Sequence, residues 1–167
     1  MRKMFAVLAS VVPSVQLVTL FFVATSALAD DRNGLTGNWK LVSFYTEDAQ
    51  TKERINVYGE RPKGYAAITP DGRLFAVVTA EGRKSPQTAD EQAAAFRSMI
   101  AYTGKYRVEG HKFITTVDAA WNEGWIGSEQ VRFWQLEGNR LSITTALMTN
   151  PNQNGGMMVG TLVWERE

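Results

Sequence analysis

Short apolar runs, each bounded by turn-forming residues, recur from residue 37 to the end of this 167-residue chain. The clearest case is 64–80, GYAAITPDGRLFAVVTA, in which two β-rich runs flank Thr69-Pro70-Asp71-Gly72. Pro fixes the backbone at the first turn position, while Asp and Gly tolerate the conformations that follow, so this segment predicts a β-hairpin.

Further strands are expected on the same grounds at 37–46, 54–58, 105–109, 112–118, 128–136, 141–147 and 157–166. Gly110-His111 and Gly138-Asn139 supply tight turns for two more hairpins. In the first strand, simple alternation places Trp39, Leu41, Ser43 and Tyr45 on one face and Lys40, Val42 and Phe44 on the other. Eight or more short strands joined by turns indicate one all-β domain, either an antiparallel sandwich or a closed barrel.

One short helix is expected among the strands, at about 89–101. Thr88 and Glu91 form a T-x-x-E capping box, and Gly104 follows where a C-terminal cap is expected. The apolar stripe of this segment is narrow and consists of Phe96, Met99 and Ile100. The helix is therefore expected to lie against the domain, either covering an open side of it or acting as a lid.

The first 29 residues have the layout of a secretory signal peptide. Arg2 and Lys3 precede a stretch at 4–28 that is almost free of charge, and Ser26-Ala27-Leu28-Ala29 has the small residues of a cleavage site. We therefore expect cleavage after Ala29, a short segment at 30–34 and a folded domain at 35–167. An uncleaved membrane anchor is the alternative, because the apolar stretch is long enough to span a bilayer.

The composition disfavours or excludes several classes of function. Without Arg2 and Lys3, 16 basic residues face 17 acidic ones, so nothing in the overall charge favours nucleic acid as a partner. The chain has no cysteine, which excludes disulfides, thiolate metal sites, a cysteine nucleophile and the acylated cysteine of a lipoprotein. We expect a periplasmic or secreted protein with no cofactor, no metal and no membrane contact after cleavage.

Several segments, in this order, resemble the bacterial lipocalin-like domain proteins, a calycin-type family of small barrels. The segments are LTGNWKLVS at the start, PKGYAAITPDGRLFAV, YTGKYRV, WIGSEQVRFWQLEGNRLSI and the closing LVWERE. The resemblance covers about 35–167 and implies an antiparallel up-and-down β-barrel of about 8–10 strands with an interior cavity. It also implies a small hydrophobic or amphipathic ligand in that cavity.

The resemblance further implies a structural pair at the closed end of the barrel. In lipocalins, the Trp of a Gly-x-Trp motif packs there and an Arg from near the last strand lies across its ring. Here these residues are Trp39 and Arg166, with Arg132 as the competing arginine. Such a cation–π contact contributes about 1–2 kcal/mol when it is desolvated.

The strand at 128–136 contains the strongest candidates for ligand binding, Gln130, Arg132 and Trp134. If their face points inward, Gln130 and Arg132 line the cavity beside Trp134 and bind a carboxylate or carbonyl of an otherwise apolar ligand. If the strand has the opposite orientation, all three lie on the surface. The alternation alone leaves both orientations open, and the resemblance favours the inward one.

Aromatic residues supply the other candidates. Trp121 and Trp125 are expected either to pack in the core at one end or to guard the cavity mouth. The candidates for the cavity wall, each also explained by core packing, are Tyr65, Phe75, Tyr102 and Tyr106.

Evidence for an enzyme is weak. His111 is expected in an exposed turn, and Asp118 and Glu123 in an exposed loop, so no acid–base pair stands out. The leading hypothesis is a binding protein. Two alternatives stay open: a cavity enzyme of the isomerase or cyclase type, acting on a small carbonyl compound through Arg132 with a Tyr or Asp118, and a structural module with a filled core.

Overall fold

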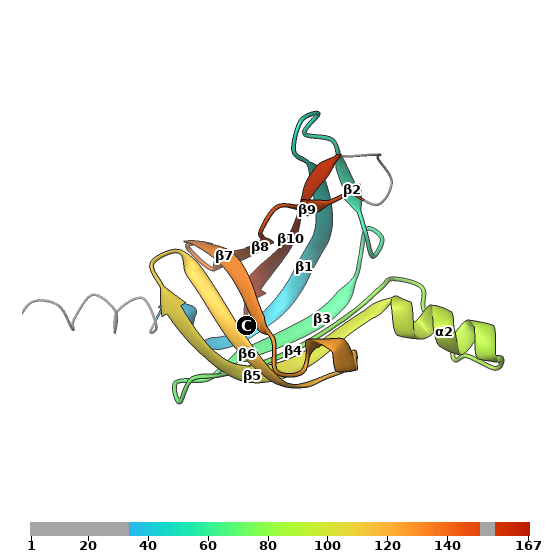
Figure 1. The fold of residues 1–167 in the computed structure, drawn as a ribbon, viewed down its shortest axis with the longest axis horizontal. Helices are drawn as coiled ribbons and strands as arrows, with labels where there is room; N and C mark the ends of the chain where they lie inside the picture. The colour runs from blue at the N-terminus through green and yellow to red at the C-terminus, as the bar shows by residue number, and fades with distance from the viewer. Residues whose placement is uncertain (1–33, 151–155) are drawn as a thin grey trace, which may run out of the picture.

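The computed structural model describes residues 34–150 and 156–167, and the expected signal peptide lies outside them. The described part is almost entirely β-structure (Figure 1). Its strands are β1 (Gly37–Asp48), β2 (Arg54–Asn56), β3 (Lys63–Ile68), β4 (Arg73–Thr79), β5 (Met99–Glu109), β6 (Lys112–Ala120), β7 (Glu129–Glu137), β8 (Arg140–Thr145), β9 (Met148–Thr149) and β10 (Met157–Arg166). Two further elements are the α-helix α2 (Ala89–Arg97) and the 3₁₀ helix η1 (Glu123–Trp125).

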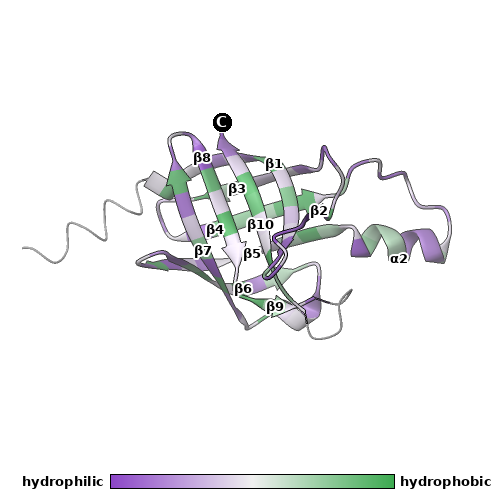
Figure 2. Ribbon diagram, turned by 90° about the horizontal axis from the view of Figure 1, so that it is seen from above, coloured by the Kyte–Doolittle hydropathy of each residue, from purple (hydrophilic) through white to green (hydrophobic). Residues whose placement is uncertain are grey.

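Eight of these strands close into an antiparallel barrel. The order is β1-β3-β4-β5-β6-β7-β8-β10, and β10 pairs with β1 to complete the ring, while β2 and β9 extend it at the side. The all-β barrel expected from the sequence is therefore confirmed, and the sandwich alternative is excluded. Figure 2 shows the hydrophobic and hydrophilic residues alternating along the barrel strands, as strands with one buried face require.

Strand β1 differs from the simple alternation. Its register against β10 shifts between Leu41 and Ser43, because Val42 is an extra residue in a β-bulge. Leu41 pairs with Trp164 and Phe44 with Leu162, so both face inward. The expected faces are thus wrong beyond the bulge: Phe44 belongs with Trp39 and Leu41, whereas Ser43 and Tyr45 face outward.

The helix is shorter than expected. The Thr88–Glu91 capping box is present, but α2 ends at Arg97 and β5 begins at Met99. The expectation of a helix to about 101 is therefore wrong: Met99 and Ile100 pair with Thr79 and Val78 of β4, and these pairs override the helical stripe.

Gly104 lies inside β5 rather than at a helix end. A Cβ there would come within 2.1 Å of the Thr116 carbonyl oxygen, because the β5–β6 register shifts at this point. Glycine is required there for close backbone approach.

Helix α2 projects away from the barrel on the β4–β5 connection (Figures 1 and 2). Within the described residues, none of its side chains is buried. It therefore covers little of the barrel. No helix in the described part of the chain is long and apolar enough to cross a membrane.

Candidate functional site

The barrel encloses a cavity of about 300 Å³. Its lining is mainly apolar and comes from all eight barrel strands, together with Val57, Trp125 and Met148. Val57 and Met148 are also exposed to solvent, at 42% and 38%. The cavity therefore opens at the end where β1, β4, β6 and β8 finish, which we call the mouth.

The opposite end, which we call the floor, is closed by large buried side chains. Trp39, Leu141 and Trp164 are at most 5% exposed and form the bottom of the cavity. The Trp39 indole N–H donates to the Leu35 carbonyl oxygen at 2.9 Å, and Leu35 is fully buried beneath it.

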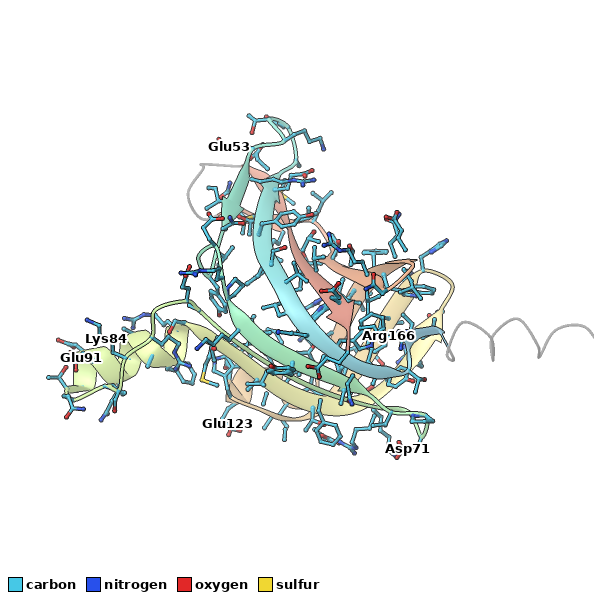
Figure 3. All side chains as sticks on the ribbon, turned by 180° about the vertical axis from the view of Figure 1, so that it is seen from behind. Glu53, Asp71, Lys84, Glu91, Glu123 and Arg166 are labelled. Atoms are coloured by element: carbon cyan, nitrogen blue, oxygen red, sulfur yellow. The ribbon has the colours of Figure 1, made fainter. Side chains whose placement is uncertain are left out.

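Arg166 completes the floor. Its guanidinium carbon lies 4.2 Å from the centre of the Trp39 ring, and its two terminal nitrogens donate to the carbonyl oxygens of Thr36 and Gly34. Figure 3 shows Arg166 at the end of the barrel where β1 begins. This is the Trp–Arg pair that the resemblance implied, and Arg132 does not compete for it.

Strand β7 places the Arg132 side chain on the inward face of the barrel. Arg132 pairs with Phe113 on one side and with Thr145 on the other, and all three line the cavity. Gln130 and Trp134 share this inward face because strand residues two apart point the same way. The orientation left open by the sequence is therefore the inward one.

The guanidinium of Arg132 bends towards the start of β7. It donates to Gln130 Oε1 and to the Val131 carbonyl oxygen, each at 2.8 Å, and Gln130 is itself held by Ser128 Oγ at 2.9 Å. Its guanidinium carbon lies 5.9 Å from the Trp125 ring centre. Arg132 thus reaches the mouth, where Trp125 lies.

Burial dominates the electrostatics of this region. It lowers the pKa of the Arg132 guanidinium, an effect that the nearby Tyr102 phenol partly opposes. Burial also raises the pKa of the Tyr102 phenol, and the charge of Arg132 lowers it to a smaller extent. Tyr102 therefore keeps its proton at neutral pH and can donate it in a hydrogen bond.

Aromatic rings form one wall of the mouth. Trp125 makes edge contacts with Tyr102 and Trp121, at centroid distances of 5.4 and 4.8 Å. Trp121 continues outward to Phe96 of α2 at 6.3 Å. Of the two expected rim tryptophans, Trp125 lines the cavity, whereas Trp121 lines a shallow groove on the outside of the barrel.

Other candidates lie away from the cavity. Tyr65 and Phe75 are about half exposed on the outer face, where they line the same shallow groove as Trp121. Tyr106 is buried below the cavity, stacked on Phe113 at 4.8 Å, and its hydroxyl donates to the Thr69 carbonyl oxygen. Trp134 packs against the core, and its indole N–H donates to the Gly110 carbonyl oxygen.

The polar candidates are on the surface. His111 is exposed in the β5–β6 turn, 6.0 Å from the Trp134 ring. Asp118 forms an exposed ion pair with Arg73 at 2.8 Å, and Glu123 points away from the barrel (Figure 3). Asp118 is therefore not placed to act with Arg132. Among the described residues, no His, Asp and Glu side chains gather as a metal site.

Some cavity residues were not identified from the sequence. Phe44 was assigned to the wrong face because of the bulge, and Thr145, Met148 and Met158 lie where the expected strands begin or end. A signal for Thr145 was present, since it is two and four residues beyond the inward Ile143 and Leu141. The two methionines became recognisable only once the pairing of β9 with β10 was known.

A comparison with protein-family models agrees with this geometry. A comparison with curated proteins gave no match. The family model described as a lipocalin-like domain matches residues 36–167, which is the whole barrel. The chain therefore belongs to the lipocalin-like domain family.

Proposed function

We propose that this protein is exported and binds a small hydrophobic or amphipathic molecule inside the barrel. The observation that supports the binding is the apolar cavity, which runs from the Trp39 floor to the exposed Met148 at the mouth. Its volume of about 300 Å³ lies at the lower end of the range for ligand pockets. An open apolar cavity also argues against the alternative of a structural module with a filled core.

Binding is tested by displacement of an environment-sensitive apolar dye from the purified protein. Ala76 faces the cavity on β4, so Ala76→Phe fills it and should abolish saturable uptake. The matched control is Ala67→Phe, at an outward position on β3 that lines the shallow outer groove. Uptake that survives Ala76→Phe and is lost in Ala67→Phe would place binding outside the barrel and contradict the proposal.

Export rests on the layout of residues 1–29. Expression of the complete chain in a bacterium should yield a periplasmic or secreted protein whose N-terminal residue is Asp30, as determined by N-terminal sequencing. Recovery of a chain that retains Met1 in the membrane fraction would support the uncleaved anchor instead.

A cavity enzyme is the second candidate, because Arg132 and Tyr102 line the same cavity and each shifts the pKa of the other. Such a pair could polarise a carbonyl and supply a proton. The test is to incubate a bound carbonyl compound with the wild-type protein and with Tyr102→Phe and to follow the compound by NMR. A compound left unchanged by the wild-type protein would exclude this activity.

A further inference from the structure

We propose that the ligand is a monocarboxylic acid with an apolar chain, its carboxylate at Arg132 near the mouth and its chain directed towards the Trp39 floor. The inference rests on the proposed binding function and specifies the chemical class and orientation of the ligand.

The first argument is that the charge of Arg132 has no counter-ion among the described residues. Arg54, Arg61, Arg73 and Arg107 each pair with a carboxylate on the outside of the protein. Within residues 34–150 and 156–167, Arg132 forms no ion pair, although it is partly buried and this burial lowers the pKa of its guanidinium. A buried charge is costly without a partner, so an anion that enters the cavity gains a strong interaction.

The second argument is the number of donors. A guanidinium has five N–H groups, and acceptors in the described residues engage two of those of Arg132. The remaining donors form a planar fork that matches the two oxygens of a carboxylate. The protonated phenol of Tyr102, which lines the same cavity, can add a further donor.

The third argument is the charge of the ligand. Arg132 is the only charged residue that lines the cavity within the described part of the chain. Asp48, a buried carboxylate near the mouth, accepts from the backbone N–H groups of Gln50 and Thr51 and does not line the cavity. One positive charge balances one negative charge, so a singly charged carboxylate fits better than a doubly charged phosphate.

The fourth argument is the position of Arg132 along the barrel. Its hydrogen bond to Gln130 and its approach to Trp125 hold the guanidinium towards the mouth. The part of the cavity between Arg132 and the floor, down to Leu141 and Trp164, is lined mainly by apolar side chains. A carboxylate at Arg132 therefore leaves the chain pointing to the floor.

The experiment compares ligands with the same ten-carbon chain: decanoate, decanol and decylamine, with decyl phosphate as the doubly charged arm. Affinities are measured by isothermal titration calorimetry. Decanoate should bind at least tenfold tighter than decanol and decyl phosphate, and decylamine should bind most weakly. Arg132→Gln should remove the preference for decanoate while changing the affinity for decanol less than threefold. Arg73→Gln, which removes a guanidinium on the outer face, should leave both affinities unchanged.

The outcomes separate the two proposals. If decanol binds as tightly as decanoate, or if Arg132→Gln leaves the preference intact, the carboxylate inference is overturned and barrel binding survives. If none of the four compounds binds, both fail. Arg132→Gln is expected to fold, because replacing a partly buried charge that has no ion pair among the described residues should maintain or raise the midpoint of thermal unfolding.

The orientation of the ligand in the cavity is tested by a separate experiment. In a crystal of the complex with 10-bromodecanoate, the anomalous signal of bromine should lie beside Trp164 and Leu141. A bromine beside Trp125 would show that the chain points to the mouth and would overturn the proposed orientation.

Discussion

Arg132 and Arg166 have the same guanidinium group, but the Arg166 group lies at the floor of the barrel and the Arg132 group near its mouth. Arg166 lies on the Trp39 ring and donates to the carbonyl oxygens of Thr36 and Gly34, so it ties the segment before β1 to the end of β10. Arg132 lines the cavity, and acceptors in the described residues engage only two of its five N–H groups. The first arginine therefore stabilises the fold, and the second is available to a ligand.

Loss of Arg166 should weaken the floor. We expect Arg166→Ala to lower the free energy of unfolding by about 3 kcal/mol, because it removes a cation–π contact and leaves partly buried carbonyl oxygens without a donor. Arg166→Lys keeps the charge but not the two-pronged geometry and should lose about half as much. Urea denaturation measures both. Equal stability of Arg166→Ala and the wild type would contradict a stabilising role.

Two glycines in strands should respond in opposite ways to the same change. At Gly104, an added Cβ meets the Thr116 carbonyl oxygen at 2.1 Å, so Gly104→Ala should cost about 3 kcal/mol or shift the β5–β6 register. At Gly160, the nearest atom to an added Cβ is Thr145 Cγ2 at 3.5 Å, an ordinary contact. Gly160→Ala should therefore change the free energy of unfolding by less than about 0.5 kcal/mol. Similar costs for the two variants would show that close backbone approach does not explain Gly104.

At the scale of elements, the sequence predicted most strands and hairpins, because alternation and turn residues are local signals. It could not predict the bulge at Val42, since a bulge is defined by the partner strand β10, which is distant in sequence. The end of α2 was missed for a similar reason. Met99 and Ile100 suit a helical stripe locally, but pairing with β4 satisfies their backbone groups and places Ile100 in the cavity wall.

The candidate site, like the strands and the helix, was only partly predictable from the sequence. The strand 128–136 could be singled out from its residues, but its inward face was fixed only by the pairs of Arg132 with Phe113 and Thr145. Tyr65 and Phe75 show the opposite outcome. They are large aromatic residues in a β-hairpin, yet they alternate with Ala66 and Ala76, and it is these alanines that face the barrel interior. Size and hydrophobicity did not reveal which face is buried, because the outer face of this hairpin is also apolar.

The bulge makes a prediction about deletions in β1. Removing Val42 should restore a regular strand in which Leu41 and Phe44 still face inward, so the cost should stay below about 2 kcal/mol. Removing Lys40 instead makes Trp39 and Leu41 neighbours in the strand, so they can no longer both face inward. The residues on one side of the deletion then point to the wrong face of the barrel. We expect that variant to lose cooperative unfolding, as followed by circular dichroism. A Val42 deletion that is as disruptive as the Lys40 deletion would contradict this account of the bulge.

At the scale of the whole molecule, the cavity exists because the sheet closes into a barrel. Its lining comes from strands at both ends of the chain, with Trp39 of β1 and Trp164 of β10 brought together by the β1–β10 ladder. Closure leaves no open sheet edge between the first and last barrel strands, which removes a site for aggregation. Helix α2 stands outside this ring (Figure 1).

Two deletions should therefore differ sharply in their effect on the barrel. Excising residues 83–97 removes α2 and leaves Glu81-Gly82 as a two-residue connection between Ala80 and Ser98, which already share a backbone hydrogen bond of 3.0 Å. Because α2 buries none of its side chains, the midpoint of thermal unfolding should move by less than about 4 °C. Removing residues 164–167 is a shorter deletion, but it takes away Trp164 and Arg166 and opens the floor end of the β1–β10 ladder. That variant should show no cooperative transition in differential scanning calorimetry and should bind no apolar dye. If the helix deletion proved the more damaging of the two, stability would not reside in closure of the ring.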